Sequence, residues 1–183
     1  MKSISHSGQI RIWLLSTIIM VMLMILIGGV TRLTDSGLSM VEWRPLWGFL
    51  PPISQFEWNR VFELYMKSPE YIFKNKGMSL EEFKVIFFWE YFHRLWGRLI
   101  GIIFIIPLLF FIIVKKIPKS ILSKLFLILF LGGLQGFIGW WMVKSGLVND
   151  PTVSQYRLTI HLSNALLILS LLIWVYLDVK EGV

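Results

Sequence analysis

Four long apolar segments constrain this chain most strongly, because each is long enough to cross a membrane. A helix needs roughly 20 apolar residues to cross the hydrocarbon core. We expect spans at about 12–30, 85–114, 121–143 and 158–177. The first segment lacks the small-residue cleavage site of a signal peptide, so we expect it to remain as a span. Residues 1–183 are therefore predicted to form an all-α membrane protein, a single four-transmembrane-helix bundle with a long helical outer loop over about 31–84.

The distribution of charge predicts the orientation of these spans. Hydrophobic residues make up 56% of the chain and charged residues 16%, which is typical of a multispanning protein. Although the net charge is +7, lysines crowd the short connection between the second and third spans, which argues against a nucleic-acid partner. These lysines are Lys115, Lys116, Lys119 and Lys124. Basic loops stay on the cytoplasmic side. Because two spans lie on either side of this loop, both termini are expected on the cytoplasmic side as well. The chain has no cysteine, which excludes disulfides and thiolate-bound metals.

Two histidines lie near the starts of the second and fourth spans. On this topology His93 falls at the outer boundary and His161 lies three residues into its span, at a similar depth. Ionisable side chains at membrane depth usually mark a functional site. Two imidazoles that face each other in a helical bundle can hold one heme iron. The alternative, that both are hydrogen-bonded packing residues, stays open at this point.

Charged residues accompany both histidines. Glu90 and His93 are at positions i and i+3 and share a helix face, where a carboxylate can move protons or stabilise charge on a bound substrate. Arg94, Arg98 and Arg157 could bind carboxylates as forks, heme propionates included. Equally, Glu90 could form an i, i+4 ion pair with Arg94, and the arginines could anchor the helices at the interface.

The outer loop is expected to form an ordered cap of short helices over the outer end of the bundle. Pro51 and Pro52 enforce an extended break. Ser54 can cap a helix through Phe62, and Ser79 has the capping-box spacing to Glu82.

Small residues and a short repeat indicate how the spans could pack. Gly132 and Gly136 form a small-xxx-small pair that favours close packing, against another helix or against a cofactor. The segment Asp35-Ser36-Gly37-Leu38 follows the first span, and Lys144-Ser145-Gly146-Leu147 follows the third. This echo is compatible with two hairpins of similar plan.

Several longer motifs occur in order along the chain. They are Gly28 to Ser39, Glu42-Trp43, Pro51-Pro52, Pro69 to Tyr71, Glu82 to Lys84, Glu90 to Arg98, Gln135-Gly136, Trp141 to Leu147, Val153 to Leu158 and His161-Leu162. On these motifs the chain resembles, from Ile27 to about Leu169, the amino-terminal half of heme A synthase, in the cysteine-free form of mitochondria and alphaproteobacteria.

The resemblance implies a function in heme A biosynthesis for cytochrome oxidase. Enzymes of this family oxidise a porphyrin methyl group of heme O to the formyl group of heme A by two successive hydroxylations. The resemblance assigns Glu90 as the catalytic residue and His93 and His161 as the heme ligands. It also implies the bacterial inner (plasma) membrane, with heme O synthase and cytochrome oxidase assembly factors as partners.

Family members of usual size have eight spans, and their second half carries a histidine pair that binds a heme b cofactor. This chain contains four predicted spans, and its only other histidine is His6. Three alternatives follow: an inactive truncated fragment, a chain that pairs with a separately encoded second half, or a homodimer. Two other classes also stay open. A bis-histidine membrane cytochrome would transfer electrons without using Glu90, and an assembly or transport protein would bind no heme.

Overall fold

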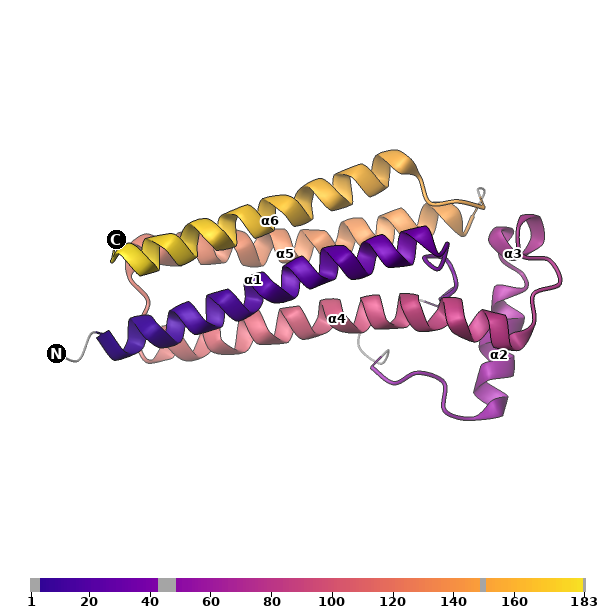
Figure 1. Ribbon diagram of the computed structural model, residues 1–183, viewed down its shortest axis with the longest axis horizontal. Coiled ribbons are helices and arrows are strands. Elements are labelled where there is room, and N and C mark those ends of the chain that lie inside the picture. Colours follow the sequence, from indigo (N-terminus) through magenta and orange to yellow (C-terminus); the bar gives the residue numbers. More distant parts are fainter. Residues whose placement is uncertain (1–3, 43–48, 149–150, 183) are drawn as a thin grey trace.

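The structure, a computed structural model, describes residues 4–42, 49–148 and 151–182, so that Trp43 of the motifs above lies outside the described residues. Its helices are α1 (Ile4–Leu33), α2 (Gln55–Tyr65), α3 (Pro69–Phe73), α4 (Leu80–Ile113), α5 (Lys119–Gly146) and α6 (Gln155–Glu181) (Figure 1). The described residues contain no strand. Helices α1, α4, α5 and α6 are long and apolar enough to cross a membrane, which confirms the predicted all-α membrane fold class.

Helix α4 runs without a break from the outer loop into the apolar span. It begins at the predicted capping box, where the Ser79 hydroxyl accepts a hydrogen bond from the Glu82 amide and the Glu82 carboxylate accepts one from the Ser79 amide. The helix continues past Pro107 to its end at Ile113. Glu90 therefore lies on the same rigid element as the start of the span.

The four long helices pack against one another unevenly. Helix α1 packs against both α4 and α6, and α5 packs against α6, whereas α4 and α5 touch over only a few residues. One apolar core joins all four helices in the half of the bundle nearer the two termini, which lie at the same end (Figure 1). Its buried members are Ile10, Trp13, Leu14, Ile18, Val21, Phe104, Leu108, Phe111, Ile121, Leu125, Ile128, Leu131, Ile168, Leu172, Val175 and Val179.

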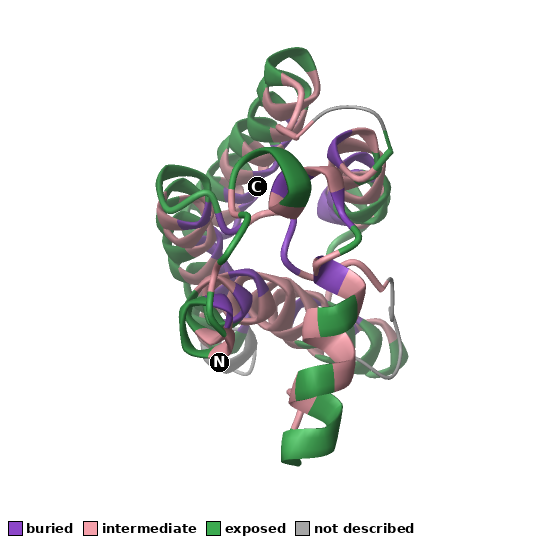
Figure 2. Cartoon of the chain, turned by 90° about the vertical axis from the view of Figure 1, so that its right-hand side faces the viewer, coloured by how far each residue is buried: buried purple, intermediate pink, exposed green. Residues whose placement is uncertain are grey.

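The other half of the bundle, which carries both histidines, is packed more loosely. On α4 no residue from 91 to 103 is buried, and none is buried from 22 to 30 on α1 or from 155 to 163 on α6. Elsewhere the described residues follow the usual pattern, with buried positions between the helices and exposed ones outside (Figure 2). Side chains at this level are thus less completely buried than in the other half, which agrees with a bulky ligand between the helices.

The outer loop forms short helices that pack on the start of α4. Ser54 caps α2 as predicted, accepting a hydrogen bond from the Glu57 amide. A second apolar cluster is built on the buried rings of Tyr65, Phe83 and Phe87 and joins α2 to α4. Figure 1 shows α2 and α3 at the end of the bundle opposite the termini. The cap is thus attached to the helix that carries Glu90 and His93.

The two similar segments, Asp35 to Leu38 and Lys144 to Leu147, contact each other. Leu38, in the loop after α1, packs so closely against Gly146, at the end of α5, that a Cβ atom there would lie 2.7 Å from the leucine side chain. Leu38 is fully buried by this contact and its neighbours. The turn after the first span therefore rests on the turn after the third, which ties the α1–α4 pair to the α5–α6 pair.

The glycine pair of the third span does not pack against another helix within the described part of the chain. A Cβ atom built at Gly132 or Gly136 would meet nothing within 4 Å. The prediction that this pair packs against another helix or a cofactor therefore stays a prediction. Close packing occurs instead one turn further on, at Gly139, where the neighbour is His161.

Candidate functional site

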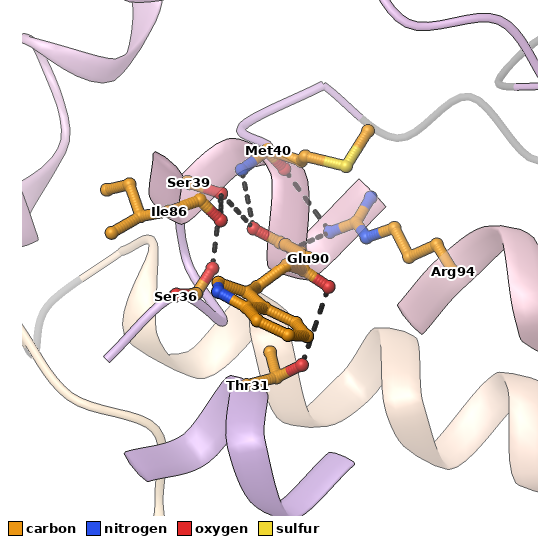
Figure 3. Close-up of polar contacts among 8 residues, drawn as sticks. Thr31, Ser36, Ser39, Met40, Ile86, Glu90 and Arg94 are labelled. Atoms are coloured by element: carbon orange, nitrogen blue, oxygen red, sulfur yellow. Dashed lines mark hydrogen bonds and ion pairs between the residues drawn. The ribbon is translucent and has the colours of Figure 1, made fainter. Parts of the chain in front are cut away.

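The carboxylate of Glu90 is buried and held by three donors (Figure 3). Its Oε2 atom accepts hydrogen bonds from the Ser39 hydroxyl and from the Met40 backbone amide, each at 2.7 Å. Its Oε1 atom accepts one from Arg94 at 2.5 Å. Because Ser39 and Met40 belong to the loop after α1, Glu90 joins this loop to α4.

Arg94 contributes to the same contact between the loop after α1 and helix α4. Besides its ion pair with Glu90, its guanidinium donates to the backbone carbonyl of Met40 at 3.3 Å. The i, i+4 ion pair left open by the sequence is therefore present. The arginine lies against the loop, and its predicted contact with a propionate stays a prediction.

Each histidine lies against a glycine of a neighbouring helix. A Cβ atom at Gly28 of α1 would lie 3.1 Å from Cε1 of His93, and one at Gly139 of α5 would lie 3.1 Å from Cε1 of His161. The structure therefore places both predicted ligands in the half of the bundle away from the termini, each with a ring edge against a glycine.

The Nδ1 atoms of both histidines are buried and accept or donate no hydrogen bond within the described part of the protein. Buried polar atoms are paired in the great majority of cases, so an orphan nitrogen on each ring needs an explanation. A polar partner outside the described residues would satisfy each of these atoms.

Two amide side chains near His161 carry contacts that the sequence analysis did not assign. Gln135 donates to the backbone carbonyl of His161 at 3.1 Å, and the same nitrogen lies 3.3 Å from the Nε2 atom of the ring. Asn164, one turn after His161, is buried and donates to the Gln135 side chain at 2.7 Å. The signal was available, since polar residues within apolar spans are rare and often functional.

The remaining predicted arginines contact aromatic rings. The Arg98 guanidinium lies 5.4 Å from the ring centre of Phe49. Arg157 lies 4.2 Å from the ring centre of Trp141 and donates to the backbone carbonyl of the same tryptophan at 2.7 Å. These contacts hold both side chains at the outer end of the bundle, and binding of propionates by them stays a prediction.

A buried polar cluster in the outer cap was also not predicted. The Tyr65 hydroxyl donates to Glu70 at 3.1 Å and accepts from Asn75 at 2.7 Å. Glu70 is only 3% exposed, and burial raises its pKa to about 7, an effect that the tyrosine hydrogen bond opposes in part. Burial also raises the pKa of Tyr65. The cluster lies in the cap, and we assign it to the stability of that region.

The residues present fit a heme better than a bare metal ion. The described residues contain no group of three or more His, Cys, Asp or Glu side chains that could hold an ion. A heme iron needs only two protein ligands, because the porphyrin supplies the others. The two imidazoles, the glycine against each ring and the incomplete burial of side chains at this level all agree with such a ligand.

Comparisons with known proteins agree with this chemistry. The family model described as cytochrome oxidase assembly protein matches residues 11–183. A heme A synthase of Nitrosospira multiformis is 56% identical over 169 residues, which cover 92% of this chain and 48% of that relative. A heme A synthase of Parvibaculum lavamentivorans is 46% identical over 181 residues, 99% of this chain and 53% of the relative. The chain thus spans about half the length of the curated relatives it matches. No solved structure matches it.

Proposed function

Because the chain belongs to the family of cytochrome oxidase assembly proteins, we propose that it binds heme O and takes part in oxidising it to heme A. The observation that carries the proposal is the matched pair of imidazoles, each held by a glycine of the neighbouring helix. In this reaction a porphyrin methyl group becomes a formyl group by two successive hydroxylations, and the bound heme supplies a redox-active iron.

The proposed parts of the chain's own residues follow from their positions. His93 on α4 and His161 on α6 would bind the heme iron. Glu90 lies one turn before His93 on the same helix face. Its carboxylate would move protons or stabilise charge on the bound substrate. Ser39 and Arg94 orient it, because both donate to its oxygens. Arg98 and Arg157, at the outer end, are the proposed partners of the propionates.

We further propose that oxidation needs a second four-helix unit with a heme b. The relatives are about twice as long as this chain. Each hydroxylation removes two electrons from the methyl carbon, so the reaction needs an electron acceptor, and a second redox centre would carry the electrons towards it. Both units would lie in the bacterial plasma membrane, and α1 would begin and α6 would end on its cytoplasmic side.

Heme analysis after co-expression with a heme O synthase tests the proposal. The chain is purified in detergent, and its heme is extracted and identified by chromatography and mass. Heme A or a hydroxylated intermediate would support activity of the chain itself. Bound heme O without oxidation would support a binding half that needs its partner. A protein without heme would contradict the proposal.

Three variants separate the proposed enzyme from a bis-histidine cytochrome. His93→Ala and His161→Ala are expected to lose heme. Glu90→Ala is expected to keep heme and to lose conversion in any preparation where the parent converts it. Glu63→Ala, an exposed carboxylate of the cap, serves as the matched control. Unchanged conversion in Glu90→Ala would remove the catalytic assignment and favour an electron carrier.

A further inference from the structure

A continuous chain of hydrogen bonds links α5 to α6 beside His161. Asn164 donates to the backbone carbonyl of Leu131 at 3.1 Å and to Oε1 of Gln135 at 2.7 Å. The Gln135 nitrogen then lies 3.1 Å from the carbonyl oxygen of His161 and 3.3 Å from its Nε2 atom. All these groups are buried or half-buried in the apolar part of the bundle.

Two backbone carbonyls determine how both amides are oriented. A carbonyl oxygen only accepts, so the Asn164 atom facing Leu131 must be its NH₂ group. The second hydrogen of that group points to Gln135, which must present its oxygen there. The Gln135 NH₂ group therefore faces His161 and has two hydrogens for two acceptors, the backbone carbonyl and Nε2.

This orientation determines the tautomer of His161. A ring nitrogen that faces an N–H group must accept, so Nε2 carries the lone pair and Nδ1 carries the proton. A neutral imidazole binds a metal through its lone pair, and the proton on the other nitrogen preserves that tautomer. The chain thus prepares Nε2 as the binding atom.

We propose that Gln135 is a positioning residue that keeps Nε2 of His161 unprotonated and oriented. When heme binds, Nε2 would exchange its hydrogen bond from Gln135 for a bond to the iron. The inference rests on the proposed heme-binding function. Asn164 acts on the histidine through Gln135. Its hydrogen bond to Oε1 prevents the Gln135 amide group from rotating by 180°. Gly139, one turn further along α5, lies against Cε1 of the same ring.

Nitrogen NMR of the heme-free protein, labelled on histidine and held in detergent, tests the tautomer directly. The wild-type His161 signals are expected to show one protonated nitrogen, Nδ1. In Gln135→Leu the preference is lost and both tautomers appear. Asn164→Leu, a second variant in case the first folds poorly, is expected to weaken the same preference. A wild-type ring protonated on Nε2, or an unchanged tautomer in both variants, would overturn the proposal.

Heme titration followed by the Soret band supplies the second readout. Gln135→Leu is expected to bind heme several-fold more weakly than wild type, because the ring no longer starts in the binding orientation. Gln155→Leu removes an exposed glutamine from the first turn of α6 and should bind as wild type does. Equal heme affinity in wild type and Gln135→Leu would count against the positioning role. Failure of wild type to bind heme would instead defeat the proposed function, while the tautomer measurement would still report on Gln135.

Discussion

Gly28 lies so close to His93 that a single methyl group at the glycine would come within 3.1 Å of the ring carbon Cε1. The two residues are on different helices, α1 and α4. The same distance separates a methyl group at Gly139 from Cε1 of His161, on α5 and α6. Two helix pairs therefore present a histidine in the same way, with a glycine against the edge of the ring.

Alanine at these glycines should impair heme binding. Gly28→Ala and Gly139→Ala each push the ring or separate the helices by a few tenths of an ångström, an overpacking effect of about 1–3 kcal/mol. We expect heme affinity to fall by roughly tenfold in each variant, as about 1.4 kcal/mol corresponds to a factor of ten. Soret titration measures the change. Gly29→Ala and Gly133→Ala, where a Cβ meets nothing within 4 Å, should bind normally, and a loss there would show that the effect is not local.

Removal of Arg94 should destabilise the junction between the loop and α4. In Arg94→Met the buried Glu90 loses its cation while two uncharged donors remain. Breaking a buried ion pair costs about 3–5 kcal/mol, and we expect a clearly lower unfolding temperature in detergent.

Arg32→Met is the matched control for this change. Arg32 pairs with Asp35 in a largely exposed ion pair, of the kind that contributes about 0–1 kcal/mol. Equal losses of stability in the two variants would contradict the structural role assigned to the Glu90 pair.

The stability of the cap should depend on pH through Glu70. Burial raises its folded pKa to about 7, above the value in the unfolded chain, so folding favours the protonated acid. This contribution to the free energy of unfolding is complete at pH below the unfolded pKa and disappears as pH rises through 7, a change of about 3 kcal/mol. Thermal unfolding in detergent at pH 5 and pH 8.5 measures it. Glu70→Gln, which mimics the protonated acid, should show a smaller difference between the two pH values; an identical difference would refute the assignment.

Gly146 should tolerate no side chain. A Cβ atom there would lie 2.7 and 2.8 Å from the side chain of the buried Leu38 and 3.1 Å from the backbone oxygen of Thr152. We expect Gly146→Ala to lower the free energy of unfolding by about 1–3 kcal/mol. In Gly136→Ala the methyl group meets nothing within 4 Å, so stability should stay equal or rise through helix propensity. Comparable destabilisation of both would show that the Leu38 contact does not hold the two hairpins together.

Local signals in the sequence predicted the helices and their starts. The apolar segments gave four long helices, Ser54 caps α2, and Ser79 with Glu82 begins α4. Apart from the end of α4 at Ile113, the helices extend past the expected spans, because polar turns at their ends continue the helix and carry no hydropathy signal.

The contacts of the candidate site depended on the fold. Sequence spacing indicated the ion pair of Glu90 with Arg94, four residues away, but not its bond to Ser39, which is 51 residues away. In the described part of the chain nothing lies within 4 Å of a Cβ atom built at Gly132 or Gly136, since small residues show where close approach is possible and not which group makes it.

The sequence by itself therefore determined that the chain forms membrane-length helices and that a histidine lies near the start of two of them. These features depend on residues that are neighbours along the chain. Only the tertiary structure decided that Gly28 meets His93, that Gly139 meets His161 and that Gln135 faces the ring of His161. Such contacts join different helices, and their geometry is set by how the helices pack rather than by any local preference of the backbone.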